Sequence, residues 1–229
     1  MLGRCHELGR GVAQSDPLAA QWYARAADKG LDWAQFNLAN LVLRGRGAVP
    51  DAARAMALYR AAACQGHAKA MNMIGRLYEE GWAIPRDLRL AFHWYRCAAE
   101  GGDFRGQYNF GTLLIAFNRI SEATVWLERA VSNGTQDFLS AISAAMLASE
   151  HHGVRTLGML ATARQAASPT VLQRGSWSDR AAVGRSRDTA AQAVDRWFNL
   201  AAGSRLPIRA DRPTAQESPD PDLPQPALC

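Results

Sequence analysis

The sequence has few lysines, few cysteines and no long hydrophobic run. Lys29 and Lys69 are the only lysines among 26 basic residues, so arginine carries almost all of the positive charge. The four cysteines follow no regular spacing, which argues against a disulfide scaffold and favours free thiols. No stretch reaches the roughly 18 uncharged apolar residues of a transmembrane helix. The first eleven residues carry three charges and no apolar segment, unlike a signal peptide.

Short catalytic motifs are also absent. The sequence contains no Gly-x-Ser-x-Gly, His-Glu-x-x-His, phosphate-loop or dinucleotide-binding pattern. His93 and Cys97 lie four residues apart, a spacing that lets two side chains on one helix share a metal, but no further ligands follow nearby. The adjacent pair at 151–152 is predicted to lie in a solvated loop. We therefore predict no catalytic residue, no cofactor and no metal site.

The net charge of +5 is spread over the chain rather than gathered in one segment. Residues 1–150 carry 16 basic and 14 acidic residues, a net of +2, and residues 151–229 carry 10 and 7, a net of +3. A nucleic-acid-binding segment normally shows a basic stripe with little opposing charge. Nucleic-acid binding through the arginine-rich C-terminal part is therefore an alternative that the charge pattern does not favour.

What the sequence does have is a repeat. Small and aromatic residues recur in three copies at steps of 36 residues. In the fourth copy, the residues of the second half follow after a step of 32, and the small residue of the first half follows after a further 36. The recurring sets are Trp22-Tyr23, Leu58-Tyr59, Trp94-Tyr95 and Trp126-Leu127; Ala19, Ala55, Ala91 and Ala123; Ala26, Ala62, Ala98 and Ala130; Gly30, Gly66, Gly102 and Gly134; and Gly3, Ala39, Gly75 and Gly111. Recurrence of both residue type and spacing predicts a stack of similar units.

Each unit is predicted to fold as two helices. In the first unit, apolar residues at spacings of three and four predict a second helix over residues 17–28. In the third unit the first helix is predicted over residues 69–80. The glycine that follows each second helix is typical of a left-handed helix terminus. Small residues such as Gly75 allow the two helices to approach closely, and large aromatic residues fill the space between units.

The third unit carries the pattern most fully. Its residues are Ile74-Gly75, Tyr78, Gly81, Asp87, Ala91, Trp94-Tyr95, Ala98-Ala99 and Gly102. This pattern resembles the Sel1-like repeat, a relative of the tetratricopeptide repeat, over roughly residues 1–138. The resemblance implies an all-α fold, a right-handed α/α superhelix of about four helix-pair repeats. We expect these repeats at about residues 1–34, 35–70, 71–106 and 107–138.

The two ends of the chain depart from the repeat. Capping helices are predicted over residues 139–167, then a linker from 168, a possible short helix over 189–202 and a disordered proline-rich tail. At the other end, Met1-Leu2-Gly3 aligns with Met73-Ile74-Gly75, so the first helix lacks about one turn. A fragment or a misplaced start codon is favoured over a naturally trimmed array, because a truncated repeat leaves an apolar face uncapped.

The resemblance also implies a partner-binding groove, because first helices line the concave side in the tetratricopeptide superfamily. The positions that match are Arg4, Asn37, Asn40, Lys69, Asn72, Arg76, Arg105, Asn109 and Thr112. An asparagine amide can donate and accept at once, which suits an extended peptide, and basic side chains beside it suit a carboxylate. The competing interpretation is that these are simply solvated polar residues.

We therefore predict a non-catalytic protein–protein interaction module, or scaffold, in bacterial regulation or complex assembly. The expected partner is a protein or peptide with acidic or C-terminal carboxylate groups, and no membrane is expected to take part. The expected location is cytoplasmic, or periplasmic if an N-terminal signal is missing from this chain. An enzyme is the main alternative, since cysteine-rich relatives have been proposed to bind or hydrolyse β-lactams. Those relatives carry a cysteine pair in each repeat, whereas Cys64 and Cys97 occupy non-equivalent positions.

Overall fold

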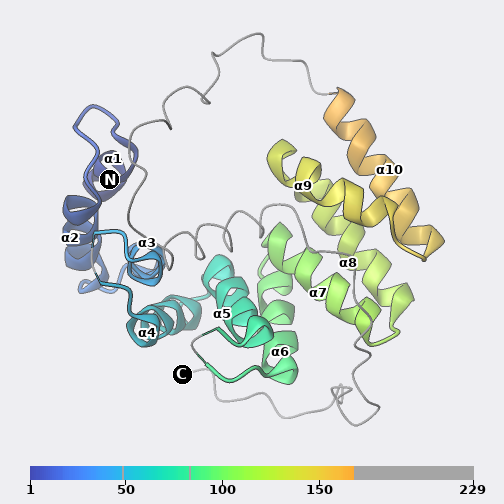
Figure 1. Ribbon diagram of the computed structural model, residues 1–229, viewed down its shortest axis with the longest axis horizontal. Helices are drawn as coiled ribbons and strands as arrows, with labels where there is room; N and C mark the ends of the chain where they lie inside the picture. Colours follow the sequence, from blue (N-terminus) through green and yellow to red (C-terminus); the bar gives the residue numbers. More distant parts are fainter. Residues whose placement is uncertain (48, 83, 168–229) are drawn as a thin grey trace, which may run out of the picture. The chain divides into compact units, whose positions relative to one another are not determined.

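The computed structural model describes residues 1–47, 49–82 and 84–167, and over these residues the chain forms helices and no strands. They fall into two compact units, Met1–Asn133 and the residues that begin at Gly134 (Figure 1). The helices of the first unit are α1 (Leu2–Leu8), α2 (Asp16–Ala27), α3 (Asp32–Arg44), α4 (Ala52–Cys64), α5 (Ala68–Glu80), α6 (Leu88–Glu100), α7 (Phe104–Ala116) and α8 (Ile120–Asn133). The second unit contains α9 (Gln136–Leu147) and α10 (His152–Ala167). The predicted linker, short helix over 189–202 and tail lie outside the described residues.

The first unit consists of four helix pairs in chain order: α1 with α2, α3 with α4, α5 with α6, and α7 with α8. Each helix packs against the next one along the chain, and α5 also contacts α7. The first helices of the third and fourth pairs are thus neighbours, as in a stack of repeated units. This arrangement confirms the predicted all-α repeat fold.

Side-chain caps fix where the second helices begin. Ser15 caps α2, and Asp51 and Asp87 cap α4 and α6 by accepting hydrogen bonds from backbone N–H groups of the first turn. Asp16 follows its cap as the first helical residue, where a negative charge favours the helix dipole. These residues satisfy N–H groups that have no partner within the helix, which sets each boundary.

Left-handed residues end the helices. Gly30, Gly66 and Gly102 all have positive φ, as the repeat predicts, and the first helices α1, α3 and α5 end at a second set of such glycines. At Gly66, φ is +86°, a conformation that costs a side-chain-bearing residue energy. The fourth pair departs from this pattern, because Asn118 takes the left-handed conformation between α7 and α8.

A close contact between a glycine and a large side chain holds three of the four pairs together. A Cβ atom placed at Gly75 would lie only 2.7 Å from the ring of Tyr95, which is fully buried. The same contact recurs between Gly3 and Tyr23 and between Gly111 and Leu127. The second pair has Ala39 at this position and a fully buried Tyr59 opposite. The small residues of the repeat are therefore required by the large side chain that packs on them.

The hydroxyl groups of the buried tyrosines have different partners in different pairs. Tyr23 donates to Glu7 Oε2 at 2.7 Å, and Tyr95 donates to Glu79 Oε2 at 2.6 Å. In the second pair the glutamate position is occupied by Leu43, which is fully buried. Tyr59 instead donates to Asn40 Oδ1 at 2.7 Å, and its complete burial raises its pKa. Each buried hydroxyl thus has an acceptor, as burial requires.

Aromatic rings connect each pair to the next. Tyr23 of α2 meets Trp33 of α3 edge to face, with ring centroids 5.4 Å apart. Farther along, Phe92 of α6 meets Phe110 of α7 at 5.0 Å. Such pairs contribute roughly 0.5–1.5 kcal/mol beyond the apolar area that they bury. The core of the first unit is therefore a series of interfaces between neighbouring pairs.

Arg46 makes an electrostatic connection between the first two pairs. It lies after α3, and its guanidinium group bonds both carboxylate oxygens of Asp16 at 3.0 and 2.7 Å. A further nitrogen lies 3.6 Å from Glu7 Oε1. These groups are about three-tenths exposed or less, so solvent screens them less than a surface pair. The arginine joins α1, the start of α2 and the end of α3.

The second unit is a single helix pair with its own apolar core. Phe138, Leu139 and Ile142 of α9 are buried, as are Val154 and Ala161 of α10. Gly158 allows the helices to approach, since a Cβ there would lie 2.9 Å from the Leu147 backbone nitrogen. The Gln136 amide donates to backbone carbonyls at the far end of α10 at 3.1 Å.

The described cysteines only partly follow the expectation of free thiols. Cys5 and Cys97 are free and half-buried. Cys64 takes part in a disulfide, so the prediction of a free thiol is wrong for this residue. No cysteine spacing in the sequence marks such a bond.

We expect Gly75→Ala to destabilise the chain. The added methyl would collide with a buried ring that cannot move away, because the hydroxyl of Tyr95 is tied to Glu79. Overpacking costs about 1–3 kcal/mol, and the better helix propensity of alanine offsets up to about 1 kcal/mol of it. Urea unfolding should therefore show a net loss of about 1–2 kcal/mol. An unchanged midpoint would contradict the packing account, and Ala57→Ser at an exposed position of α4 is the control.

Candidate functional site

The nine residues predicted to line a groove lie on the first helices of the four pairs. Arg4 lies on α1, two asparagines lie on α3, and three residues each lie on α5 and α7. Because α5 and α7 contact each other, the predicted residues on these two helices are the ones that can act together. The structure brings some of them into direct contact and leaves others apart.

Asn72 and Asn109 form a hydrogen-bonded pair between consecutive repeats. Asn109 Nδ2 donates to Asn72 Oδ1 at 2.8 Å. Thr112 Oγ1 donates to the Asn109 backbone carbonyl at 2.9 Å, which places a hydroxyl one turn farther along α7. Asn72 and Thr112 are buried and Asn109 is half-buried, so the amides are held rather than freely rotating.

Their mutual hydrogen bond leaves the Asn72 amide nitrogen and the Asn109 carbonyl oxygen uncommitted. Among the described residues, Asn72 Nδ2 and Asn109 Oδ1 have no further partner, and neither is among the fully buried atoms that lack one. An asparagine amide offers two N–H donors and a carbonyl acceptor. The pair therefore presents N–H donors of Asn72 next to the carbonyl acceptor of Asn109, a pattern that complements a peptide group.

Arg76 lies one turn beyond Asn72 on α5. Its side chain is largely buried and donates to Glu80 Oε1 at 3.1 Å, an ion pair between residues four apart on one helix. The guanidinium group thus has an internal counter-ion. Arg76 adds positive charge beside the amide pair, but part of that charge is already balanced.

The remaining predicted residues are not brought together. Asn37 donates to the Trp33 backbone carbonyl at 2.8 Å within its own helix. Asn40 accepts from Tyr59, as described above, so it supports the core. The exposed residues are Arg4, Lys69 and Arg105, of which Arg105 lies over the Phe104 ring at 4.7 Å. Lys69 and Arg105 occupy equivalent positions near the starts of α5 and α7.

A buried polar cluster beside these helices was missed by sequence reasoning. His67 and Asp103 precede α5 and α7, and Gln107 lies one turn into α7. His67 Nε2, Asp103 Oδ1 and Gln107 Oε1 are buried without a hydrogen-bond partner among the described residues. The 36-residue step between His67 and Asp103 is the one signal that could have paired them. Unsatisfied polar atoms are costly in a protein interior.

Burial shifts both titratable groups of this cluster toward their neutral forms. Desolvation raises the pKa of Asp103, although a hydrogen bond from the Gly106 N–H and nearby positive charges act in the opposite direction. Desolvation likewise lowers the pKa of His67, opposed by the charge of Asp32. The cluster is therefore poorly suited to hold charge, and the described residues contain no group of three or more His, Cys, Asp or Glu side chains that could hold a metal.

His93 and Cys97 do come together, but without the features of a reactive site. Cys97 Sγ lies 3.6 Å from His93 Nε2 on α6. Burial raises the pKa of the Cys97 thiol and lowers the pKa of the His93 imidazole, so both groups favour the neutral state. A nucleophilic cysteine needs the opposite shift, toward the thiolate.

Paired helices with left-handed ends and a small residue packed against a large side chain define an α-helical repeat protein. Residues 1–31, 34–67 and 68–103 match the Sel1 repeat family. These residues thus carry Sel1 repeats, as the resemblance in the sequence predicts.

Two fungal regulators are among the curated relatives. Chitin synthase regulatory factor 3 of Schizosaccharomyces pombe is 34% identical over 104 residues, 44% of this chain and 11% of that protein. Chitin synthase regulator SKT5 of Malassezia restricta is 37% identical over 115 residues, 49% of this chain and 8% of that protein. The chain thus spans about a tenth of the length of these relatives.

Two solved bacterial structures share the fold. The protein c5321 of uropathogenic Escherichia coli, a protective antigen with an SLR fold, is 26% identical with a TM-score of 0.61 and covers 72% of this chain and 37% of that one. A Sel1 repeat protein from Oxalobacter formigenes is 23% identical with a TM-score of 0.61, covering 95% and 81%. Together they confirm an all-α superhelical repeat fold.

None of the described helices is both long enough and apolar enough to cross a membrane.

We expect Asp103→Asn to stabilise the chain at neutral pH. Burial raises the folded-state pKa of Asp103 above its unfolded value. The stability that the folded chain gains by binding this proton is therefore complete below the unfolded pKa. It is lost as pH rises through the folded pKa. Asparagine keeps the cap without the buried charge. Urea unfolding should show a gain at about pH 7 that shrinks toward about pH 4.

The matched control is Asp51→Asn, which changes an exposed cap of α4 in the same way. If both substitutions changed stability equally at each pH, burial of Asp103 would not be the cause.

Proposed function

We propose that this chain is a non-catalytic protein-binding module that holds an extended segment of a partner protein along its first helices. The observation that carries the proposal is the Asn72–Asn109 pair, which joins consecutive repeats and leaves a donor beside an acceptor. The predicted binding surface comprises Arg4, Asn37, Asn40, Lys69, Asn72, Arg76, Arg105, Asn109 and Thr112. Of these, we assign the central contact to the asparagine pair.

A peptide backbone suits this pair because each peptide group offers one N–H and one carbonyl. Asn72 Nδ2 would donate to a carbonyl of the partner, and Asn109 Oδ1 would accept from an N–H. Their mutual hydrogen bond fixes both amides before the partner arrives, so little side-chain entropy is lost on binding. Contacts of this kind recognise the backbone, and side-chain selectivity has to come from neighbouring groups.

Lys69 and Arg105 are the neighbouring groups that favour an acidic partner. Both are exposed, lie in the first turns of α5 and α7 and occupy equivalent repeat positions. Positive charge near the two helix N-termini, which themselves favour anions, would attract aspartate, glutamate or a C-terminal carboxylate. Exposed charges act mainly on the association rate and on selectivity, and salt weakens them.

The relatives support a regulatory or scaffolding role in a coarse sense. Two of them are named as a regulator or regulatory factor of chitin synthase, and this chain matches only a small part of each. We therefore propose binding and assembly as its function, without transferring their target. A setting in bacterial regulation or complex assembly and a cytoplasmic location are part of this proposal.

The test is reversal of the exposed charges. Peptides selected from a random display library against the wild-type chain would be measured by fluorescence anisotropy, with free and amidated C-termini. We expect Lys69→Glu/Arg105→Glu to weaken the binding of acidic peptides about tenfold or more. A tenfold change in Kd corresponds to about 1.4 kcal/mol. Asn109→Ala should weaken all selected peptides, because it removes the backbone contact.

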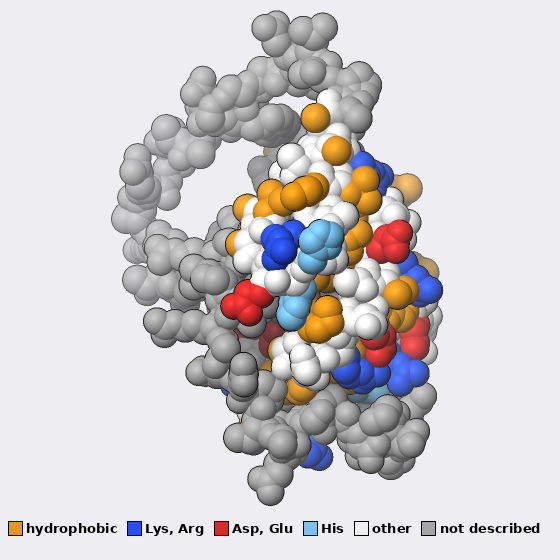
Figure 2. Space-filling model, turned by 90° about the vertical axis from the view of Figure 1, so that its right-hand side faces the viewer, with side chains coloured by type: hydrophobic (Ala, Val, Ile, Leu, Met, Phe, Trp, Pro, Cys, Tyr) orange, Lys and Arg blue, Asp and Glu red, His pale blue; other side chains and the backbone are white. Residues whose placement is uncertain are grey.

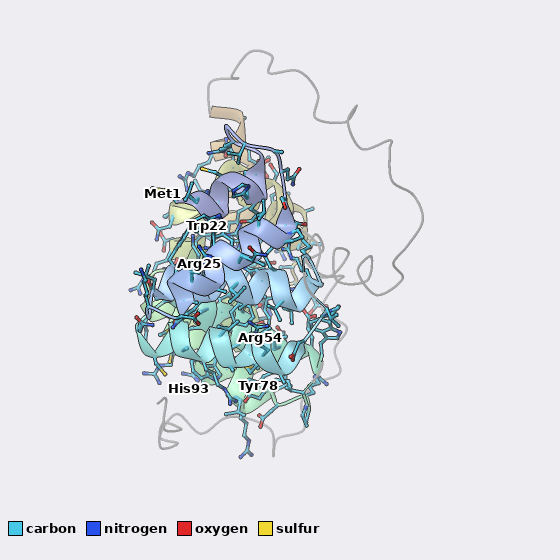
Figure 3. All side chains as sticks on the ribbon, turned by 90° about the vertical axis from the view of Figure 1, so that its left-hand side faces the viewer. Met1, Trp22, Arg25, Arg54, Tyr78 and His93 are labelled. Carbon is cyan, nitrogen blue, oxygen red and sulfur yellow. The ribbon has the colours of Figure 1, made fainter. Side chains whose placement is uncertain are left out.

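The matched control is Arg54→Glu/Arg89→Glu, which reverses two exposed charges in the first turns of the second helices α4 and α6. Figure 3 shows this other set of helices, with Trp22 and Arg25 on α2, Arg54 on α4 and His93 on α6. Equal losses of peptide affinity in both double variants would contradict the proposed surface. Selected peptides whose affinity is unchanged by Asn109→Ala would contradict it as well.

A further inference from the structure

The outer face of α10 carries an exposed apolar stripe. Met159 is 63% exposed and Leu160 is 44% exposed. Thr156 and Ala163, one turn to either side, are also exposed. Thr156 and Ala163 are seven positions apart, and the adjacent Met159 and Leu160 each lie three or four positions from both, so the four share one face of the helix. Figure 2 looks onto the side of the molecule that carries α10 and shows hydrophobic side chains lying between charged ones.

The opposite face of the same helix is already used. Val154, Gly158 and Ala161 are buried, and Gly158 packs against α9. The helix is therefore apolar on two sides, and only one side is covered within the described residues. A helix that is apolar all around is normally covered on both sides. The stripe formed by Thr156, Met159, Leu160 and Ala163 is called the α10 stripe below.

We propose that residues 189–202 of the same chain form a helix that docks on the α10 stripe. The sequence of this segment places Val194, Trp197, Phe198 and Ala201 at spacings of three and four, which predicts an apolar helix face that includes two large aromatic rings. On a helix its polar residues Gln192, Arg196 and Asn199 fall on the other side. The segment thus supplies an apolar helix face that matches the exposed α10 stripe.

Chain length and charge both favour this occupant. The chain continues for 62 residues beyond Ala167, and the 21 residues of 168–188 are ample to bring 189–202 back onto α10. The short tether keeps the local concentration of the segment high, so it competes well against other apolar surfaces. Arg164 is exposed at the edge of the stripe, and Asp195 lies at the edge of the predicted apolar face. Docking would extend the helix stack of the second unit by one member.

Oxidation of Met159 in the full chain tests the proposal. A docked segment shields its thioether from hydrogen peroxide, whereas Met1, which is 96% exposed, serves as an internal reference. We expect Met159 to oxidise about tenfold more slowly than Met1, because reaction requires the segment to open. In Trp197→Ser/Phe198→Ser, the Met159 rate should rise to that of Met1. Peptide mass spectrometry measures both rates in one sample.

The control variant is Leu223→Ser/Leu228→Ser, which removes two apolar residues of the tail outside the segment and should leave Met159 protected. The proposal is wrong if Met159 oxidises as fast as Met1 in the wild-type chain, or if Trp197→Ser/Phe198→Ser leaves the rate unchanged. It is also wrong if protection disappears on dilution, because a second copy of the chain would then cover the stripe.

Discussion

The close approach of two helices at a glycine is the constraint on which the rest of the structure depends. Where Gly75 meets the Tyr95 ring, no side chain fits between the helices, so the pair has one spacing and one register. That register places the tyrosine hydroxyl against Glu79 and directs the next apolar residues toward the following pair. Every later feature of the first unit, including the amides that meet between α5 and α7, requires this spacing to be repeated.

The fold could be predicted from the sequence because its determinants are local and periodic. The 36-residue step relates Tyr23, Tyr59 and Tyr95, and each lies opposite a small residue of the preceding helix. Helix beginnings and ends also depend on neighbouring residues, as at Asp87 and Gly102. Repetition therefore presents the same local signal several times and reduces the chance of misinterpreting it.

The candidate site was harder to predict because it depends on contacts between residues about 36 positions apart. The sequence placed Asn72 and Asn109 on one surface but could not show that they bond each other, since their positions in the repeat differ by one. Nor could it show that Asn40 is occupied by the Tyr59 hydroxyl, which follows from a leucine replacing a glutamate nearby. The burial of Asp103 and His67 likewise depends on how closely consecutive pairs approach.

Arg46 has a consequence for how such an array can change in length. Repeat proteins gain and lose whole units, and a unit that contacts its neighbours only through common apolar positions can be moved freely. Arg46 belongs to the second helix pair, yet its two carboxylate partners, Asp16 and Glu7, belong to the first pair. At the equivalent position of the third pair stands Trp82, which cannot replace that charge. The first two pairs are therefore matched to each other, and a recombination that separated them would leave two acidic side chains without their cation.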